Sequence, residues 1–206
     1  MEFLAGWDLV SLIKAAGYAG LFVIVFAESG LFIGFFLPGD SLLFTAGFLA
    51  SQGFLNIWAL APLVFSAAIL GDNFGYAFGK KVGPAIFSRE DSWLFHKDHM
   101  ERARIFYEKH GAKTLVLARF LPVARTFAPI LAGVGRMHYP TFFFYNILGA
   151  AFWALGVTWL GYFLGATIPG VDKYLIPIIL VIIVVSILPT LIHIIKNKEY
   201  IIAKRK

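Results

Sequence analysis

The sequence predicts an all-α integral membrane protein, and three observations support this fold class. Of the 206 residues, 59% are hydrophobic and only 15% are charged. The mean hydropathy is +0.78, and a soluble domain of this size cannot bury so much apolar surface. Several apolar stretches approach the ~20 residues that a helix needs to cross a hydrocarbon core. We expect a small helical bundle with two facing re-entrant helical hairpins that are related as inverted repeats.

Four apolar segments are candidates for ordinary spanning helices. Residues 57–79, 141–165 and 174–195 have the length of a complete span. Residues 10–27 form a shorter segment, which can either cross the bilayer or lie tilted within it. The segment at residues 174–195 is expected to be the last transmembrane helix.

Two further apolar stretches contain helix-breaking residues that do not suit an ordinary span. The first stretch is interrupted at Gly30, Gly34, Pro38 and Gly39, and the second at Pro122, Pro129, Gly133 and Gly135. Irregular backbone at membrane depth survives only where it is buried in protein or lines a water-filled cavity. We therefore expect re-entrant hairpins at residues 28–50 and 114–135.

Basic residues gather in two places, and this sets the expected topology. Residues 80–113 hold eight lysines and arginines, and the tail at residues 196–206 holds five. Because cytoplasmic loops carry an excess of Lys and Arg, both segments are expected on the cytoplasmic side of a multi-pass protein. Within the loop, Asp98 and Glu101 resemble a capping box that starts an amphipathic helix along the leaflet. Topology therefore explains the net charge of +6 better than nucleic-acid binding does.

Short motifs recur along the chain at a nearly constant offset. Phe36-Leu37-Pro38 recurs as Phe120-Leu121-Pro122, Ala46-Gly47 as Ala132-Gly133, and Gly75-Tyr76 with Gly79 as Gly161-Tyr162 with Gly165. The offsets are 84, 86 and 86 residues. We expect residues 17–79 and 114–165 to be inverted repeats whose broken elements meet near the bilayer midplane, an arrangement that is typical of transporters.

Four ionisable residues lie inside the broken apolar stretches: Glu28, Asp40, Arg119 and Arg125. Such a group at bilayer depth costs about 2.5–3.5 kcal/mol on insertion scales, so those that are present usually line a pathway or pair with one another. The arginines either bind an anion such as phosphate, which suits planar guanidinium groups, or form salt bridges with the two acids. The acids either carry protons or only neutralise the arginines.

Asp72 and Arg136 are secondary candidates for the site. Asp72 lies in a predicted span beside a glycine ladder that most simply forms a helix-packing face, made of Gly71, Gly75, Gly79 and Gly83. Arg136 follows the second hairpin, where it either anchors the protein at the lipid headgroups, which we favour, or belongs to the pocket.

No metal or cofactor site is expected. The sequence has no cysteine, and the loop residues that could be offered as metal ligands lack any firm zinc spacing: His96, Asp98, His99 and Glu101. Trp153 and Trp159 are assigned to packing or to an aromatic belt.

These residues resemble the DedA family of membrane proteins, also called the SNARE-associated or VTT-domain family. The similarity spans about residues 17–165 and is carried by Glu28-Ser-Gly with Pro38-Gly39-Asp40, by Gly71-Asp72 through Gly75-Tyr76 to Gly79-Lys80, and by Arg119-Phe-Leu-Pro-Val-Ala-Arg125 with Ala132-Gly133. The resemblance implies facing re-entrant hairpins, a place in the bacterial inner membrane and a role in moving lipids. By the motif match, Glu28 and Asp40 would respond to protons, and Arg119 and Arg125 would bind phosphate.

The expected function is translocation of a lipid with an anionic phosphate headgroup, without enzyme activity. The resemblance points to undecaprenyl phosphate or a phospholipid such as phosphatidylethanolamine, with dependence on the proton gradient. Two alternatives stay open, a proton-coupled antiporter of small cations or cationic drugs and a non-transporting assembly factor. The expected partners are therefore lipids and protons. Small-residue faces such as Gly161-x-x-x-Gly165 can pack helices within one chain or between chains, so a homo-oligomer stays open.

Overall fold

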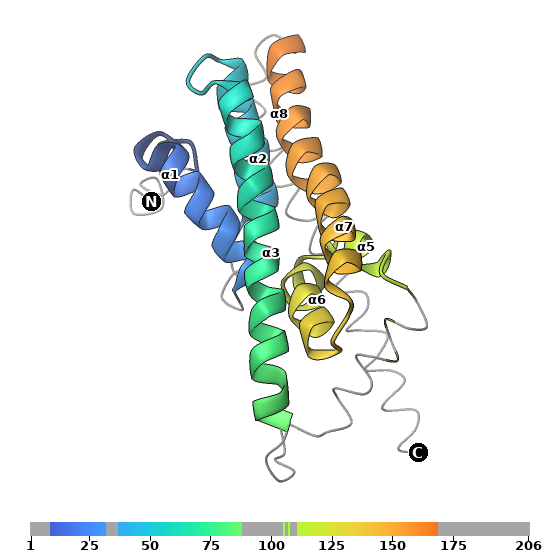
Figure 1. Ribbon diagram of the computed structural model, residues 1–206. Coiled ribbons are helices and arrows are strands. Elements are labelled where there is room, and N and C mark those ends of the chain that lie inside the picture. The colour runs from blue at the N-terminus through green and yellow to red at the C-terminus, as the bar shows by residue number, and fades with distance from the viewer. Residues whose placement is uncertain (1–8, 32–36, 88–104, 106, 108–110, 169–206) are drawn as a thin grey trace, which may run out of the picture.

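The computed structural model describes residues 9–31, 37–87, 105, 107 and 111–168, and the secondary structure of this part is helical throughout (Figure 1). The elements are α1 (Leu9–Gly30), α2 (Gly39–Ser51), α3 (Ile57–Phe87), α5 (Thr114–Ala118), α6 (Pro122–Val134), α7 (Tyr139–Ala150), the π-helix η2 (Ala151–Leu155) and α8 (Gly156–Thr167). The predicted all-α class is confirmed for these residues.

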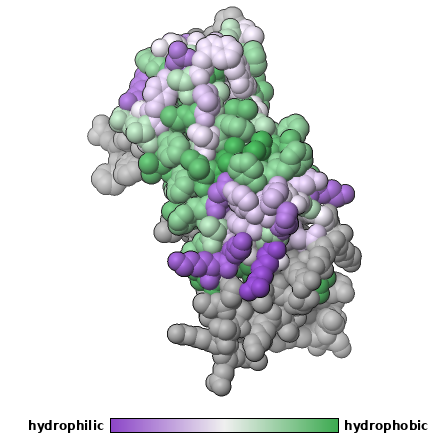
Figure 2. Space-filling model, in the orientation of Figure 1, coloured by the Kyte–Doolittle hydropathy of each residue, from purple (hydrophilic) through white to green (hydrophobic). Residues whose placement is uncertain are grey.

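Three helical runs are long and apolar enough to cross a membrane: Ile13–Gly30, Ile57–Val82 and Tyr139–Thr167. The last run joins α7, η2 and α8 into one continuous rod (Figure 1). Two of these runs contain the predicted spans at residues 57–79 and 141–165, and α1 extends the shorter segment at residues 10–27. Figure 2 shows hydrophobic residues across the middle of one face, with hydrophilic residues gathered below them. The predicted span at residues 174–195 and the basic tail lie outside the described residues.

Helices α2 and α6 are too short to cross a bilayer. Each has 13 residues, which corresponds to about 20 Å at 1.5 Å per residue, whereas a hydrocarbon core is about 30 Å thick. Nearly every residue of α2 is buried inside the protein. These lengths agree with hairpins that enter and do not cross. The complete re-entrant course and the inverted relation of the repeats stay predictions, since residues 32–36 lie outside the described part.

The two short helices pack on spanning helices from opposite halves of the chain. Helix α2 lies along α8, and α6 lies along the lower half of α3 in Figure 1. In the first pair, a Cβ atom on Gly47 would collide with the carbonyl oxygen of Thr158, and one on Gly161 with that of Phe44. The backbones therefore touch at the glycines of the repeated motifs.

The second pair also makes contacts between glycines and the partner backbone. A Cβ atom on Gly133 would collide with the carbonyl oxygen of Tyr76, and one on Gly79 with that of Ile130. The predicted packing role of the glycine ladder on α3 is visible here, because Gly79 contacts α6. Gly71 contacts α1, where its added Cβ would lie 2.6 Å from the carbonyl oxygen of Phe26.

The segment at residues 80–113 is described only in part. Helix α3 continues to Phe87, and Tyr107 is buried against α6, where its hydroxyl donates a hydrogen bond of 2.8 Å to the carbonyl oxygen of Ala128. Burial raises the pKa of the Tyr107 phenol. The predicted capping box at Asp98 and Glu101 lies outside the described residues.

Candidate functional site

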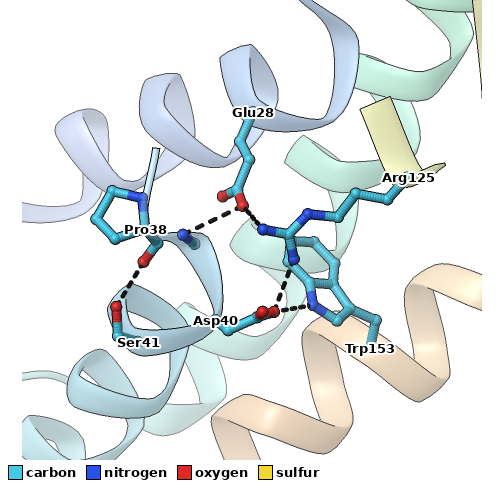
Figure 3. Close-up of polar contacts among 7 residues, drawn as sticks. Glu28, Pro38, Asp40, Ser41, Arg125 and Trp153 are labelled. Atoms are coloured by element: carbon cyan, nitrogen blue, oxygen red, sulfur yellow. Dashed lines mark hydrogen bonds and ion pairs between the residues drawn. The ribbon is translucent and has the colours of Figure 1, made fainter. Parts of the chain in front are cut away.

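Arg125 lies between two carboxylates at the meeting point of α1, α2 and α6 (Figure 3). Its Nη2 donates to Oε1 of Glu28, and its Nη1 donates to Oδ1 of Asp40 at 2.7 Å. The indole Nε1 of Trp153 donates to the same Asp40 oxygen at 2.6 Å. We call these four residues the Arg125 cluster.

Local backbone geometry brings these side chains together. Arg125 lies in the first turns of α6, which begins at Pro122 after the extended residue Leu121. Asp40 lies in the first turn of α2, where the helix dipole favours a negative charge. The backbone N–H of Gly39 donates to Oε1 of Glu28 at 3.1 Å. Any side chain at Gly39 would overlap the Glu28 carboxylate, so the glycine allows this approach.

The Arg125 cluster is buried and holds more acid than base. The exposed fraction of the side chain is 0% for Glu28, 8% for Arg125 and 19% for Asp40. One guanidinium therefore faces two carboxylates, and one bound proton would balance their charge. Among the described residues, Oε2 of Glu28 and Nε of Arg125 are buried without a hydrogen-bond partner. Buried polar atoms are normally paired, so these two atoms have hydrogen-bonding capacity that the protein does not use.

Arg119 belongs to a second cluster. Its Nη2 donates to Oδ2 of Asp72 on α3 and to Oδ1 of Asn146 on α7, the latter at 2.6 Å. Asn146 is fixed in turn, because its Nδ2 donates to the carbonyl oxygen of Ile69 at 3.2 Å. Gly149 leaves room for Arg119, since an added Cβ would lie 2.7 Å from its Cδ and Nε atoms. We call Arg119, Asp72 and Asn146 the Arg119 cluster.

Trp153, a member of the Arg125 cluster, also lies near Arg119. The guanidinium carbon of Arg125 is 5.0 Å from the centroid of the Trp153 ring, and that of Arg119 is 5.9 Å from it. Both distances suit cation–π attraction. The indole belongs to the π-helix η2, and π-helical turns occur frequently at functional sites. Two buried arginines from one broken stretch therefore share one aromatic ring.

The structure distributes the predicted site residues over both clusters. Glu28, Asp40 and Arg125 come together as one group, and Arg125 forms the salt bridges that were the alternative to anion binding. Arg119 has a different partner from the predicted acids, because it pairs with Asp72. Asp72 was predicted only as a secondary candidate for the site, and the structure makes it the ion-pair partner of Arg119.

The remaining candidates lie around these clusters or outside the described part. Pro38 accepts a hydrogen bond of 2.9 Å from the Ser41 hydroxyl, Pro122 begins α6 and Pro129 lies within it. Gly30 packs closely on α3, and Gly34 is outside the described residues.

Arg136 is exposed in the turn after α6, away from both clusters. Its φ of 52° is left-handed. The backbone N–H groups of Arg136 and Met137 donate to the carbonyl oxygens of Gly133 and Ala132 at 3.0 and 2.9 Å. This pattern is a Schellman motif with Arg136 at the position that glycine usually occupies.

Sequence reasoning missed Trp153 and Asn146. Asn146 offered a signal, since it is the one side-chain amide in the run Tyr139–Thr167, and a buried amide needs partners. Trp153 offered none, because nothing in its neighbourhood predicts the π-helix that carries it. Within the described residues, no group of three or more His, Cys, Asp and Glu side chains could hold a metal ion.

A separate cavity of about 600 Å³ opens near the C-terminal end of the α3 span. It is lined by Asn73, Tyr76, Ala77, Lys80, Lys81 and Tyr139. The Tyr139 hydroxyl donates to Oδ1 of Asn73 at 2.9 Å. We call this cavity the lysine groove, because Lys80 and Lys81 give it a positive charge.

Comparisons with known proteins agree on one family. The VTT domain matches residues 37–163. Protein DedA of Escherichia coli K12 is 50% identical over 184 residues, which are 88% of this chain and 84% of that protein. An uncharacterized membrane protein of Mycobacterium leprae is 47% identical over 86% of this chain and 79% of its own length. Inner membrane protein YqjA of Escherichia coli K12 is 35% identical over 81% of this chain and 74% of its own length. No solved structure matches the chain with significance.

Proposed function

Because the chain belongs to the DedA family of VTT-domain membrane proteins, we propose that it moves a lipid with an anionic phosphate headgroup across the bacterial inner membrane. The lipid is undecaprenyl phosphate or a phospholipid such as phosphatidylethanolamine. The headgroup passes through the protein while the hydrocarbon tail stays in the bilayer. The activity is transport, and no bond of the lipid is broken.

The observation that carries this proposal is the buried Arg125 cluster. A guanidinium can hold two phosphate oxygens through parallel N–H groups, and in Arg125 the Nη1 and Nη2 groups each already hold one carboxylate, that of Asp40 and that of Glu28. A phosphate would replace a carboxylate as the partner of Arg125. The protein thus offers the headgroup a charge partner at a depth where an unpaired phosphate is costly.

The lysine groove supports a route for the headgroup to reach the arginines. Lys80 and Asp72 are eight residues apart on α3, about 12 Å along the helix axis at 1.5 Å per residue. Asn73 and Tyr76 line the groove between these levels. An anionic headgroup would first bind at the lysines and then move along α3 to Arg119.

Proton dependence follows from the charges of the Arg125 cluster. When phosphate takes the place of Glu28 beside Arg125, the carboxylate is left buried without a cation. A proton on Glu28 removes that charge, which is the cheaper state in a low-dielectric site. Binding of the headgroup and protonation of Glu28 are therefore expected to occur together.

The test is lipid movement in vesicles that contain the purified protein. Wild type should accelerate the transfer of labelled undecaprenyl phosphate or labelled phospholipid between leaflets. Arg125→Ala should abolish this transfer, and Arg125→Lys should reduce it, because an ammonium keeps the charge but lacks the planar fork. Arg136→Ala is the matched control, since Arg136 is an exposed arginine in the turn after α6.

Folding must be checked for each variant by thermal unfolding and by elution as a single species. If folded Arg125→Ala moves both lipids as fast as wild type, the proposed role of the Arg125 cluster is rejected.

A proton-coupled antiporter of small cations is the second candidate, and one observation favours it. The two clusters together hold three acids, Glu28, Asp40 and Asp72, for two arginines. This excess of negative charge could take a cation. Proton flux driven by a cation gradient, in vesicles where no lipid changes leaflet, would support the antiporter over lipid transport.

A further inference from the structure

We propose that α2 and α6 slide together by one helical turn along α8 and α3, and that this step moves Arg125 between two depths in the membrane. The inference rests on the proposed transport function, since it supplies the motion that such transport needs. It is carried by a difference in register between the two crossed helix pairs.

The register difference follows from the repeat offset of 86 residues. In the pair of α6 and α3, Ile130 faces Gly79 and Gly133 faces Tyr76. The equivalent residues of α2 are Phe44 and Gly47. They face Gly161 and Thr158 on α8, which correspond to Gly75 and Asp72 on α3. Compared with α6 on α3, α2 therefore contacts its spanning helix α8 at positions four residues earlier in the repeat. Four residues are one helical turn, or about 6 Å.

Each spanning helix carries a second glycine at the position that the other register requires. If α6 adopted the register of α2, the carbonyl oxygen of Ile130 would face Gly75 in place of Gly79. If α2 adopted the register of α6, the carbonyl oxygen of Phe44 would face Gly165 in place of Gly161. Only glycine allows backbones to approach this closely, as the collisions at Gly79 and Gly161 demonstrate. Both alternative positions therefore carry the residue that the exchange needs. Gly165 also packs closely in the observed register, where an added Cβ would lie 2.1 Å from the Ser51 Oγ atom.

Both displacements point toward the same end of the molecule. A shift from Gly79 to Gly75 moves α6 toward the start of α3, and a shift from Gly161 to Gly165 moves α2 toward the end of α8. These two helix ends lie together at the top of Figure 1. The ion pair between Arg125 and Asp40 joins the two helices that move. One-turn steps of packed helices are an established kind of two-state transition.

The step would change the partners of Arg125. Helix α1 is fixed on α3, because Gly30 and Gly71 leave no room for a side chain between them. Glu28 therefore stays with the spanning helices, and so does Trp153. After the step, Arg125 keeps Asp40 and leaves Glu28, and Asp40 leaves Trp153. The Arg125 guanidinium would then have lost the Glu28 carboxylate from one of its sides. It would lie about 6 Å from its present depth in the membrane.

Gly75→Ala tests the step through transport. In the observed register its Cβ would lie 3.3 Å from the Ile130 Cγ1 atom, a side-chain contact that can yield. In the shifted register the same Cβ would meet the Ile130 carbonyl oxygen. The variant should fold with the thermal stability of wild type and move lipid at least tenfold more slowly. Gly156→Ala is the control, because its Cβ would meet nothing within 4 Å. If Gly75→Ala moves lipid at the wild-type rate, the step is rejected while the transport function stands.

Spin-label distances test the step without transport, so they remain decisive if wild type moves no lipid. The chain has no cysteine, so labels can be placed at Leu70→Cys on α3 and Leu131→Cys on α6, both exposed. Gly79→Ala should shift the population to a distance shorter by up to about 6 Å, and Gly75→Ala should leave only the longer distance. A pair at Leu70 and Leu160 should not change. Gly161→Ala replaces Gly79→Ala if the latter does not fold. If the distance between the labels at positions 70 and 131 is the same in wild type and in all these variants, the proposal is overturned.

Discussion

Removing either partner of the buried pair between Arg119 and Asp72 should destabilise the protein strongly, and removing both should cost clearly less than the sum of the two single losses. Arg119→Met leaves the Asp72 carboxylate, with a side-chain exposure of 8%, without its cation. Breaking a buried pair in this way costs about 3–5 kcal/mol. Asp72→Asn leaves the Arg119 guanidinium with only amide partners and should cost a similar amount. The double variant contains neither charge, so its loss should be smaller than the sum by about 2–3 kcal/mol.

Thermal unfolding of the purified protein in detergent measures this cycle. At about 2–4 °C per kcal/mol for a chain of this size, each single variant should melt about 6–20 °C below wild type. The double variant should melt above the temperature that additive losses predict. Asp72→Asn combined with Arg136→Met is the control cycle, because Arg136 is exposed in a distant turn. Additivity within about 0.5 kcal/mol in the Arg119 and Asp72 cycle would refute the pairing.

Three further predictions concern single positions. Trp153→Phe keeps a ring beside the arginines but removes the N–H that donates to Asp40, so unfolding measurements should show a loss of about 1.5–3 kcal/mol; no loss would contradict that hydrogen bond. Gly47→Ala should lower stability by about 1–3 kcal/mol through its collision with the Thr158 carbonyl, whereas a melting temperature equal to wild type would show that α2 and α8 do not touch there. Arg136→Gly should raise stability by up to about 1 kcal/mol, because glycine adopts the left-handed conformation without strain, and a decrease would mean that the Arg136 side chain holds the turn.

The sequence could predict the helical class and the short broken elements because both follow from local features. Glycine and proline at known spacings exclude ordinary spans, and α2 and α6 do end well short of a full crossing. The repeated glycines marked the positions where the two helix pairs touch. No such local rule links a helix to its partner, however, so the crossed packing of α2 on α8 and of α6 on α3 came from the structure.

The candidate site was predictable in its charges and unpredictable in its pairing. Buried charges in an apolar stretch must find partners, which predicted that Glu28 and Asp40 would meet Arg119 and Arg125. The structure confirms this for Arg125, whereas Arg119 pairs with Asp72. The choice of Asp72 by Arg119 depends on where α5 lies against α7 and on how its end approaches Asp72 on α3, and the sequence does not encode that placement in any short motif. Trp153 was missed for the same reason, because its role depends on the position of η2 near both arginines.

The most direct test of lipid transport is an experimental structure of the protein in a lipid nanodisc that contains undecaprenyl phosphate or phosphatidylethanolamine. The proposed function predicts phosphate density within hydrogen-bond distance of Arg125 or Arg119, with the hydrocarbon tail directed into the bilayer. Phosphate density confined to the bilayer surface, with Arg125 still held by both Glu28 and Asp40, would contradict it.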